Sequence, residues 1–284
     1  MRWCLRSDST SRAPRKAEVV PSPNIWYYPQ AYELENRAQD SGGAIWRVLS
    51  EEFDWAGRDV VDVGCGDGFH LPRFAETARS VVGVEPHEPL VRRARLRVAE
   101  LPTVSVRRGS AQRLPVPDAG VDLVHARTAY FFGPGCEPGL READRVLRPG
   151  GVLIIVDLDM RSEPYGRWMR LDLPDYDAPA VDRFFADAGF RCQRVETQWH
   201  FADRLAMESV LKIEFSSKVA ARAVADVVRD NDARARFENG DAGGGITLPV
   251  GYRVLTRLKP TGLVLPGHSV SSADSFGSAS PRIP

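Results

Sequence analysis

The feature that most constrains the fold is a glycine-rich turn directly after a short apolar run. Residues 60–70 read VVDVGCGDGFH, with glycines at the alternate positions 64, 66 and 68. Glycine adopts positive φ angles without strain and leaves room for a ligand against the main chain. A helix that begins after such a turn presents unpaired backbone N–H groups. The pattern therefore predicts a strand, a tight turn and a helix, with a ligand site at the carboxyl end of the strand.

Other short β-branched runs alternate with helical patterns, which is typical of a parallel sheet covered by helices. We expect strands at 59–63, 80–84, 104–107, 121–125 and 151–157. Helical patterns occur at 44–55, 70–78, 89–101 and 140–147. The first part of the chain therefore predicts a Rossmann-like, doubly wound α/β fold.

The pattern changes after this part. The stretch 160–178 is rich in Pro, Asp and aromatic residues and is expected to be a loop or lid. We expect helices at 179–188 and 205–228 and strands at 190–201 and 246–258. Because this region is too short for a core of its own, its two strands most simply extend the first sheet.

The expected domain organisation follows from these patterns. One domain spans 23–259, with N-terminal helices over 23–57, a ligand-binding core over 58–157 and a lid with the last strands over 158–259. The leader, residues 1–22, is rich in Arg and Ser without an apolar run and does not resemble a secretory signal. The tail, residues 260–284, is rich in Gly, Ser and Pro, and both ends are expected to be disordered.

Composition excludes several classes of protein. The 38 Lys and Arg residues balance 38 Asp and Glu residues, so no field of one sign is available to hold a nucleic acid or an anionic membrane. No apolar run approaches the roughly 18 residues that span a bilayer. The 4 cysteines lie far apart without a C-x-x-C pair, which favours reduced thiols in the cytoplasm over a disulfide framework or a zinc site. Arg greatly outnumbers Lys, and GC-rich coding explains this most simply.

Two acidic residues sharpen the expected ligand. Glu85 ends the second expected strand, 21 residues after Gly64, where a carboxylate can accept hydrogen bonds from both hydroxyls of a ribose. A dinucleotide fingerprint would place its third glycine at Phe69. Asp62, two residues before the first glycine, would crowd a pyrophosphate but suits the ammonium group of an amino acid. The turn therefore favours S-adenosylmethionine over NAD(P), while a tight turn without a ligand is a third interpretation.

Four blocks of sequence carry a resemblance to a known family: VVDVGCGDG, VVGVEPHE, GSAQRLPVPDAGVDLVHAR and LREADRVLRPGGVLIIVD. Over residues 58–157 the chain resembles class I S-adenosylmethionine-dependent methyltransferases, in particular the branch of ubiquinone/menaquinone-type C-methyltransferases and small-molecule enzymes. The resemblance implies a mostly parallel seven-stranded sheet with helices on both faces and an antiparallel C-terminal strand pair. It also implies transfer of a methyl group to an O, N or C atom of an acceptor, with S-adenosylhomocysteine as product.

The resemblance also implies which residues hold the cofactor. Asp62, Gly64 and Gly66 would line the methionine portion, with Cys65 in the same turn, and Glu85 would hold the ribose. Further along the chain, Pro86 and His87 would flank the adenine, and its edge would meet Ser110, Ala111 and Gln112. The family most often has Asp where Ser110 stands, so the adenine amino group would be held by the serine hydroxyl or by water.

Catalytic candidates follow the fourth expected strand. Methyl transfer needs alignment of the nucleophile, exclusion of water and, for a protonated nucleophile, a base. His125 is the candidate base, although its backbone carbonyl could instead contact the cofactor while its ring packs. Arg127 is a candidate ligand of an acidic substrate, and Tyr130 is a third catalytic candidate.

Aromatic and acidic residues suggest the acceptor side. Phe131, beside Tyr130, is a candidate for the acceptor pocket or for core packing. Tyr27 and Tyr28 are candidate lid residues. Asp157 and Asp159 could orient a hydroxyl, but two carboxylates alone make a weak metal site, and no metal is expected.

Missing motifs narrow the acceptor. The chain lacks the Asn/Asp-Pro-Pro-Tyr/Phe and Pro-Cys motifs of nucleic-acid methyltransferases. We therefore expect a small-molecule acceptor, with neither a nucleic acid nor a membrane as partner, for a cytoplasmic monomer or homodimer. The alternatives are a protein that binds S-adenosylmethionine without methyl transfer and an NAD-dependent oxidoreductase.

Overall fold

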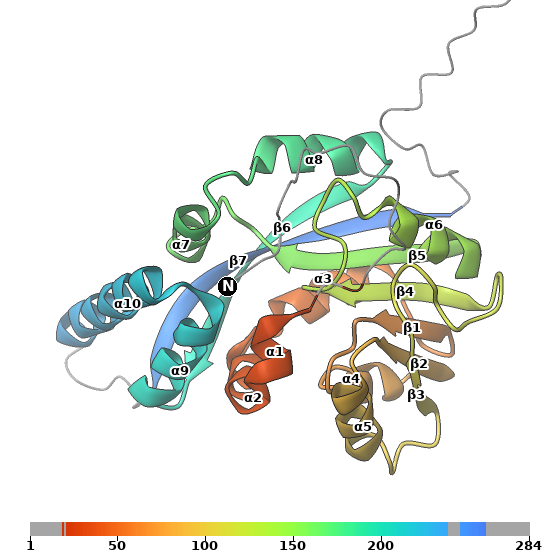
Figure 1. Cartoon of the computed structure of the whole chain (residues 1–284), viewed down its shortest axis with the longest axis horizontal. Helices are drawn as coiled ribbons and strands as arrows, with labels where there is room; N and C mark the ends of the chain where they lie inside the picture. Colours follow the sequence, from red (N-terminus) through yellow and green to blue (C-terminus); the bar gives the residue numbers. More distant parts are fainter. Residues whose placement is uncertain (1–18, 20, 238–244, 260–284) are drawn as a thin grey trace, which may run out of the picture.

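A seven-stranded sheet with the order β3-β2-β1-β4-β5-β7-β6 forms the centre of the computed structural model (Figure 1). The first five strands are parallel, and β7 pairs antiparallel with both β5 and β6. The strands are β1 (Asp59–Val63), β2 (Ser80–Glu85), β3 (Val104–Arg108), β4 (Val121–Arg127), β5 (Leu147–Leu158), β6 (Arg191–Phe201) and β7 (Ile246–Leu258). This topology confirms the Rossmann-like sheet and its antiparallel C-terminal pair.

The structure describes residues 19, 21–237 and 245–259. The tail expected at 260–284 and nearly all of the leader expected at 1–22 lie outside the described residues. The division of residues 23–259 into three parts stays a prediction.

Helices cover both faces of the sheet, as Figure 1 shows. Six helices pack on one face: α3 (Ala44–Glu52), α4 (Leu71–Ala75), α5 (Glu88–Arg97), α7 (Tyr165–Asp172), α9 (Arg204–Glu214) and α10 (Ser217–Phe237). Two helices, α6 (Glu137–Val146) and α8 (Ala178–Asp187), pack on the other face. The short helices α1 (Pro23–Tyr27) and α2 (Pro29–Ala38) precede these, and α2 contacts α9.

The two-sided covering follows from how strands present side chains. Successive residues of a strand point to opposite faces. In β1, Val60 joins the core under α3 to α5, whereas Val61 joins the core under α6 and α8, and both are fully buried. The strands of the sheet's centre therefore read as continuous apolar runs, which is what made them visible in the sequence.

Two sequence predictions about the last third were wrong in detail. The stretch expected to be a loop at 160–178 contains helix α7, whose Tyr165, Trp168 and Met169 are buried at helical spacing. The helix expected at 205–228 is two helices, because Phe215 adopts an extended backbone between α9 and α10. Asp172 at the end of α7 accepts a hydrogen bond from the backbone N–H of Ser216 at 2.6 Å, which fixes the break.

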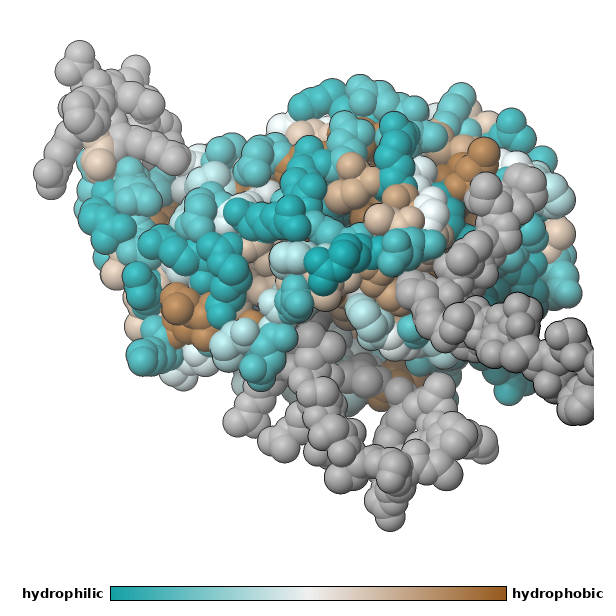
Figure 2. All heavy atoms as spheres, turned by 90° about the horizontal axis from the view of Figure 1, so that it is seen from above, coloured by the Kyte–Doolittle hydropathy of each residue, from teal (hydrophilic) through white to brown (hydrophobic). Residues whose placement is uncertain are grey.

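The surface is predominantly polar where it is described. Figure 2 shows hydrophilic side chains over most of the visible face, with apolar side chains in small separate groups. None of the helices in the described part of the chain is both long enough and apolar enough to cross a membrane.

Candidate functional site

A cavity of about 910 Å³ lies at the carboxyl edge of the parallel strands. Its walls come from the turn after β1, the ends of β2 and β4, helices α1 and α2, and the loop between α7 and α8. Side chains from β6, β7 and α9 close the far side. The cavity thus joins the glycine turn to segments that are more than a hundred residues away in the chain.

The glycine turn has the backbone that the sequence predicts. Gly64, Gly66 and Gly68 have φ angles of +72°, +57° and +83°, which residues with a Cβ rarely adopt. A Cβ on Gly64 would lie 2.7 Å from the Cβ of Ala129, and one on Gly66 would lie 2.7 Å from Ile25. The turn therefore has no space for side chains at these positions, and its main chain forms the cavity wall.

Glu85 connects this turn to the end of β2. Its Oε2 accepts a hydrogen bond from Gly66 N–H at 3.1 Å, and its Oε1 accepts one from His87 N–H at 2.9 Å. The side chain is 4% exposed, and burial raises its pKa to about 7 against the effect of the two N–H donors. A carboxylate so placed can accept further hydrogen bonds from a ligand in the cavity.

Asp62 and His125 form a buried pair between neighbouring strands. His125 Nδ1 lies 2.7 Å from Asp62 Oδ1, and β1 and β4 place the two residues side by side. His125 is 1% exposed, and its ring packs edge-on against Phe74 in the core. Asp62 lines the cavity but the His125 ring does not. This placement contradicts the prediction of His125 as a base in contact with substrate, because the ring supports Asp62 from behind.

Most residues of the predicted cofactor site line this one cavity. These are Asp62, Gly64, Cys65, Gly66, Glu85, Pro86, Ser110, Ala111 and Gln112, together with the catalytic candidates Arg127 and Tyr130. Burial raises the pKa of the Cys65 thiol well above its usual value, which keeps it uncharged. His87 does not line the cavity, because its ring stacks on Trp26 with centroids 4.1 Å apart and it is Trp26 that lines the cavity, and the contact of His87 with the adenine stays a prediction.

The predicted lid and acceptor residues lie next to the cavity wall in the chain but do not line it. Tyr27 and Tyr28 are 66% and 57% exposed and do not line the cavity, and their role as lid residues stays a prediction. Phe131 is 1% exposed within the core under α6 and α8, whereas Phe132 lines the cavity. In each case the aromatic run was recognised, but its orientation was set by packing that the sequence alone does not show.

Arg127 projects from the end of β4 into a polar network. Its Nη2 donates a hydrogen bond to Gln39 Oε1 at 2.9 Å, and its guanidinium lies over the ring of Tyr252, 5.5 Å from the centroid. Gln39 in turn donates to Glu35 Oε1 at 2.8 Å. Helix α2 and strand β7 therefore hold this arginine against the cavity.

Sequence reasoning missed a pair of buried carboxyl groups in the wall opposite the glycine turn. Glu35 of α2 and Glu214 of α9 are 4% and 2% exposed, and both line the cavity. Tyr165 donates a hydrogen bond to Glu214 Oε2 at 2.8 Å, and Asn24 donates one to Oε1. The only sign of this pair in the sequence is that Glu35 and Glu214 lie at helix positions with apolar neighbours.

The two aspartates after β5 have structural partners. Asp157 accepts a hydrogen bond from buried Arg253 at 2.6 Å, and Asp159 accepts one from Arg194 at 2.9 Å. Neither lines the cavity. Across the described residues, no group of three or more His, Cys, Asp or Glu side chains is arranged to hold a metal ion.

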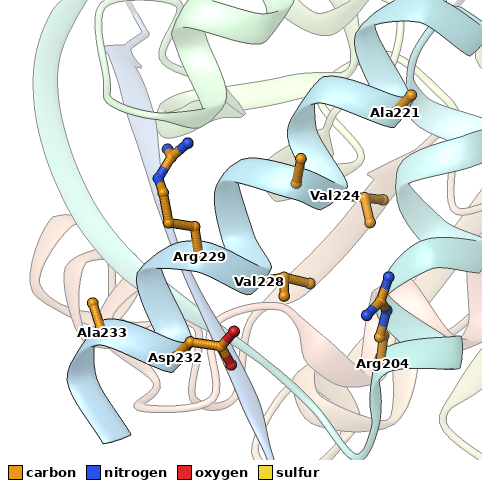
Figure 3. A pocket seen from close by; sticks show the side chains of 8 residues that line it. Arg204, Ala221, Val224, Val228, Arg229, Asp232 and Ala233 are labelled. Atoms are coloured by element: carbon orange, nitrogen blue, oxygen red, sulfur yellow. The ribbon is translucent and has the colours of Figure 1, made fainter. Parts of the chain in front are cut away.

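A second hollow, of about 590 Å³, lies between the start of α9 and one side of α10 (Figure 3). Arg204, Val224, Val228, Arg229 and Asp232 border it. It shares no residue with the glycine turn and offers one carboxyl group beside two arginines. The cavity of about 910 Å³ at the glycine turn, called the large cavity below, is the candidate functional site because it collects the predicted cofactor residues.

Comparison with known proteins supports the motif. A family model described as "Methyltransferase domain" matches residues 61–155. A protein of Mycolicibacterium smegmatis named "Probable S-adenosylmethionine-dependent methyltransferase" is 30% identical over 183 residues, which cover 63% of this chain and 70% of that protein. The 27-O-demethylrifamycin SV methyltransferase of Amycolatopsis mediterranei is 36% identical over 116 residues, or 39% of this chain and 42% of that enzyme.

A solved structure shows the same fold. The YcgJ protein of Bacillus subtilis matches with a TM-score of 0.53 and 17% identity, covering 77% of this chain and 98% of that one. The match extends beyond the residues that the family model covers, so it includes part of the region that contributes the far wall of the cavity.

Proposed function

Because the chain belongs to the S-adenosylmethionine-dependent methyltransferases, we propose that it transfers the methyl group of this cofactor to a small-molecule acceptor in the large cavity. The observation that carries the proposal is the arrangement of the turn at Gly64 to Gly68, Glu85 and Asp62 around one cavity. The same cavity extends from the turn to a wall that contains Tyr32, Trp199 and Tyr252, which provides polar and aromatic contacts for a second substrate.

The proposed cofactor contacts follow from the chemistry of each group. The main chain of the glycine turn lies against the methionine portion, Asp62 faces its ammonium group, and Glu85 accepts the ribose hydroxyls. Ser110, Ala111 and Gln112 meet the adenine edge. These residues fit the cofactor, since they combine a wall without side chains, two carboxylates for donors and a pocket for a flat ring.

The bound cofactor supplies a sulfonium methyl group as the electrophile. The protein's own contribution is to hold the acceptor in line with this methyl group and to exclude water. Arg127 and Tyr130 both line the cavity. Burial raises the pKa of Tyr130 to about 12, so its hydroxyl stays protonated, and it donates a hydrogen bond to Gly135 O at 3.3 Å. His125 acts indirectly, because its ring holds the Asp62 carboxylate in position and does not itself line the cavity.

Three further points support a small acceptor and a cytoplasmic setting. The relative from Amycolatopsis mediterranei is named for a small-molecule acceptor. Charge is balanced over the whole chain, which disfavours a nucleic-acid partner. The described cysteines, Cys65, Cys136 and Cys192, are free thiols, as a reducing compartment favours. We propose a monomer or homodimer.

The test is a binding measurement followed by a transfer measurement. We expect S-adenosylhomocysteine to raise the melting temperature and NAD(H) to leave it unchanged. Asp62→Ala and Glu85→Ala should each weaken S-adenosylhomocysteine binding about 10- to 150-fold, through loss of a charged or bidentate contact. Glu51→Ala, at an exposed position on α3, is the control and should bind normally.

Transfer is measured with methyl-labelled S-adenosylmethionine and a metabolite extract. Label in an extract compound supports the enzyme. Tight cofactor binding without any labelled product would favour the alternative of a binding protein, and normal affinity in both site variants would overturn the assignment of the cofactor residues.

A further inference from the structure

The carboxyl groups of Glu35 and Glu214 meet in a wall that the cofactor contacts do not use. Glu214 receives hydrogen bonds from Asn24 and Tyr165, and Glu35 Oε1 receives one from Gln39. The carboxyl groups of Glu35 and Glu214 hydrogen-bond to each other, and apart from Glu214 no described group donates to Glu35 Oε2. Two buried carboxyls that share one proton leave a negative charge at the cavity wall, which a cationic group of a ligand would balance.

Several ionisable groups face the pair from the elements packed around it. Arg127 of β4 reaches Glu35 only through Gln39, and the hydroxyls of Tyr32, Tyr165 and Tyr252 surround the two carboxyls. Burial raises the pKa of both glutamates, and for Glu35 the neighbouring Glu214 adds to the rise. Two carboxyls this close do not both ionise readily, so the pair retains a proton and has room for a positive partner.

The ionisable side chains around the whole cavity also favour a positively charged ligand. Eight carboxyl groups line it: Glu35, Asp62, Asp67, Glu85, Asp172, Asp175, Asp177 and Glu214. Arg127 and His70 are the basic side chains in the described wall, and burial lowers the pKa of His70 well below its usual value, which favours its neutral form. A chain that is neutral overall therefore lines this cavity with more acidic than basic side chains, although burial raises the pKa of Glu35, Asp67, Glu85 and Glu214 and so keeps part of this set protonated.

Part of this excess has partners already. Arg97 forms an ion pair with Asp67 at 2.8 Å, and we assign Asp62 and Glu85 to the cofactor. The glutamate pair keeps no direct cation among the described residues. Aromatic rings of Tyr32, Trp199 and Tyr252 share its part of the wall, and ring faces attract cations.

We propose that the Glu35–Glu214 pair binds the protonated amine of the acceptor and accepts its proton, which makes the enzyme an amine N-methyltransferase. The inference rests on the proposed function and specifies its acceptor class. A carboxylic acid acceptor would meet repulsion at this wall, and a neutral alcohol would leave the negative charge unbalanced.

The proton and electron balance is complete without another reactant. The ammonium R–NH₃⁺ gives one proton to the carboxylate of the pair, which leaves R–NH₂ with a free electron pair. This electron pair forms the N–CH₃ bond as the C–S bond of the sulfonium breaks, and sulfur keeps the electrons of that bond. The product R–NH₂⁺–CH₃ leaves with a positive charge, and the proton on the pair returns to water.

The test compares amines with alcohols of the same shape on enzyme saturated with S-adenosylhomocysteine. The probes are phenethylamine with 2-phenylethanol, tryptamine with tryptophol, and hexylamine with hexanol. We expect amines to raise the melting temperature more than their alcohols. Glu35→Gln and Glu214→Gln keep the shape of each side chain and should weaken amine binding about 10- to 100-fold, because a charge-assisted hydrogen bond is lost.

Three results separate this proposal from the function on which it rests. Normal S-adenosylhomocysteine binding in both Gln variants shows that they are folded, and Glu51→Gln is the control for the loss of a surface carboxylate. If amines fail to stabilise the wild type, or alcohols stabilise it equally, the proposal is overturned while the cofactor site stands. A ¹³C methyl label found on oxygen or carbon of the natural product would overturn it as well.

Discussion

The two halves of the cavity are built in different ways. The half around the glycine turn takes its shape from contiguous backbone, with Gly64 to Gly68 and Glu85 at the ends of adjacent strands. The opposite half takes its shape from side chains such as Glu35 and Glu214, which lie on two helices far apart in the chain, and buried Tyr165 of α7 supports Glu214 from behind. The first half is therefore fixed by local geometry and the second by tertiary packing.

This difference has a consequence for specificity. The cofactor half offers main-chain groups and two carboxylates whose positions tolerate little change. In the acceptor half, helices α2, α7 and α9 contribute side chains from outside the sheet, and these can change one at a time without disturbing it, whereas Trp199 and Tyr252 belong to β6 and β7. Substitutions should accordingly affect stability and cofactor binding in the first half, and choice of acceptor in the second.

The largest effect is expected for Gly64→Ala. An alanine at this position would have to keep the φ angle of +72°, and its Cβ would lie 2.7 Å from the Ala129 Cβ. Backbone strain and overpacking would therefore add. Together they should lower the free energy of unfolding by about 2–4 kcal/mol. Gly57→Ala is a matched control, since its φ is +66° but nothing lies within 4 Å of the added Cβ. It should cost only about 1–2 kcal/mol. Urea unfolding checks both, and equal losses would contradict the account of a closed turn.

The next effect concerns His125, whose ring orients Asp62 in the cofactor half of the cavity. His125→Phe keeps a ring but removes the contact to buried Asp62, which should cost about 1–3 kcal/mol of stability. Affinity for S-adenosylhomocysteine should fall with it, because Asp62 loses its orientation. His125→Asn retains a donor near the position of Nδ1 and should recover much of the affinity. A base that contacts substrate would behave differently, since both variants would bind cofactor normally and lose turnover.

The sequence predicts the cofactor half of the cavity better than the acceptor half. The strand ends, the turn and Glu85 were predictable because strand periodicity and glycine spacing are local signals. Helix α7 was missed because Pro and Asp around it indicate a loop, while Tyr165 and Trp168 form a helical face only in contact with the sheet. Glu35 and Glu214 were not predictable, since a glutamate on a helix normally faces water and only the packed structure shows these two buried.

The orientation of single side chains was also beyond the sequence. His125 ends its run at the cavity edge, yet alternation along β4 turns its ring into the core beside Phe74. The sequence alone does not distinguish Phe131 from Phe132, because both are phenylalanines in the same aromatic run. Only the geometry of the folded turn places Phe132 in the cavity wall. Motif spacing thus locates a segment, whereas the direction of each side chain depends on packing against distant elements.

A smaller effect is a pH dependence of cofactor binding through Glu85. Burial raises the pKa of this carboxyl from 4.5 to about 7, so the folded protein without cofactor holds a proton there that the unfolded chain has lost. Its contribution to stability therefore falls as pH rises from about 4.5 to 7. Ribose hydroxyls donate to the ionised carboxylate, so affinity for S-adenosylhomocysteine should rise with pH and level off above 7, by up to about tenfold per unit.

Calorimetric titrations at pH 6 and pH 8 measure this dependence. Glu85→Gln cannot ionise and provides the comparison, since any remaining slope in that variant belongs to other groups. An affinity of the wild type that is the same at both pH values would show that Glu85 is ionised before the cofactor binds, or that the ribose does not reach it.

The smallest effects distinguish neighbouring aromatic residues of α1. Trp26 stacks on His87 and lines the cavity, whereas Tyr27 is 66% exposed. Trp26→Ala should weaken S-adenosylhomocysteine binding about 5- to 10-fold, in line with about 1 kcal/mol for an aromatic contact. Tyr27→Ala should change stability by less than about 0.5 kcal/mol and leave the affinity unchanged, as for other exposed side chains. The two variants are compared by the same calorimetric titration. If Tyr27→Ala lost more affinity for S-adenosylhomocysteine than Trp26→Ala, helix α1 would have to rotate when the cofactor binds. Tyr27 would then belong to the wall of the cofactor half of the cavity.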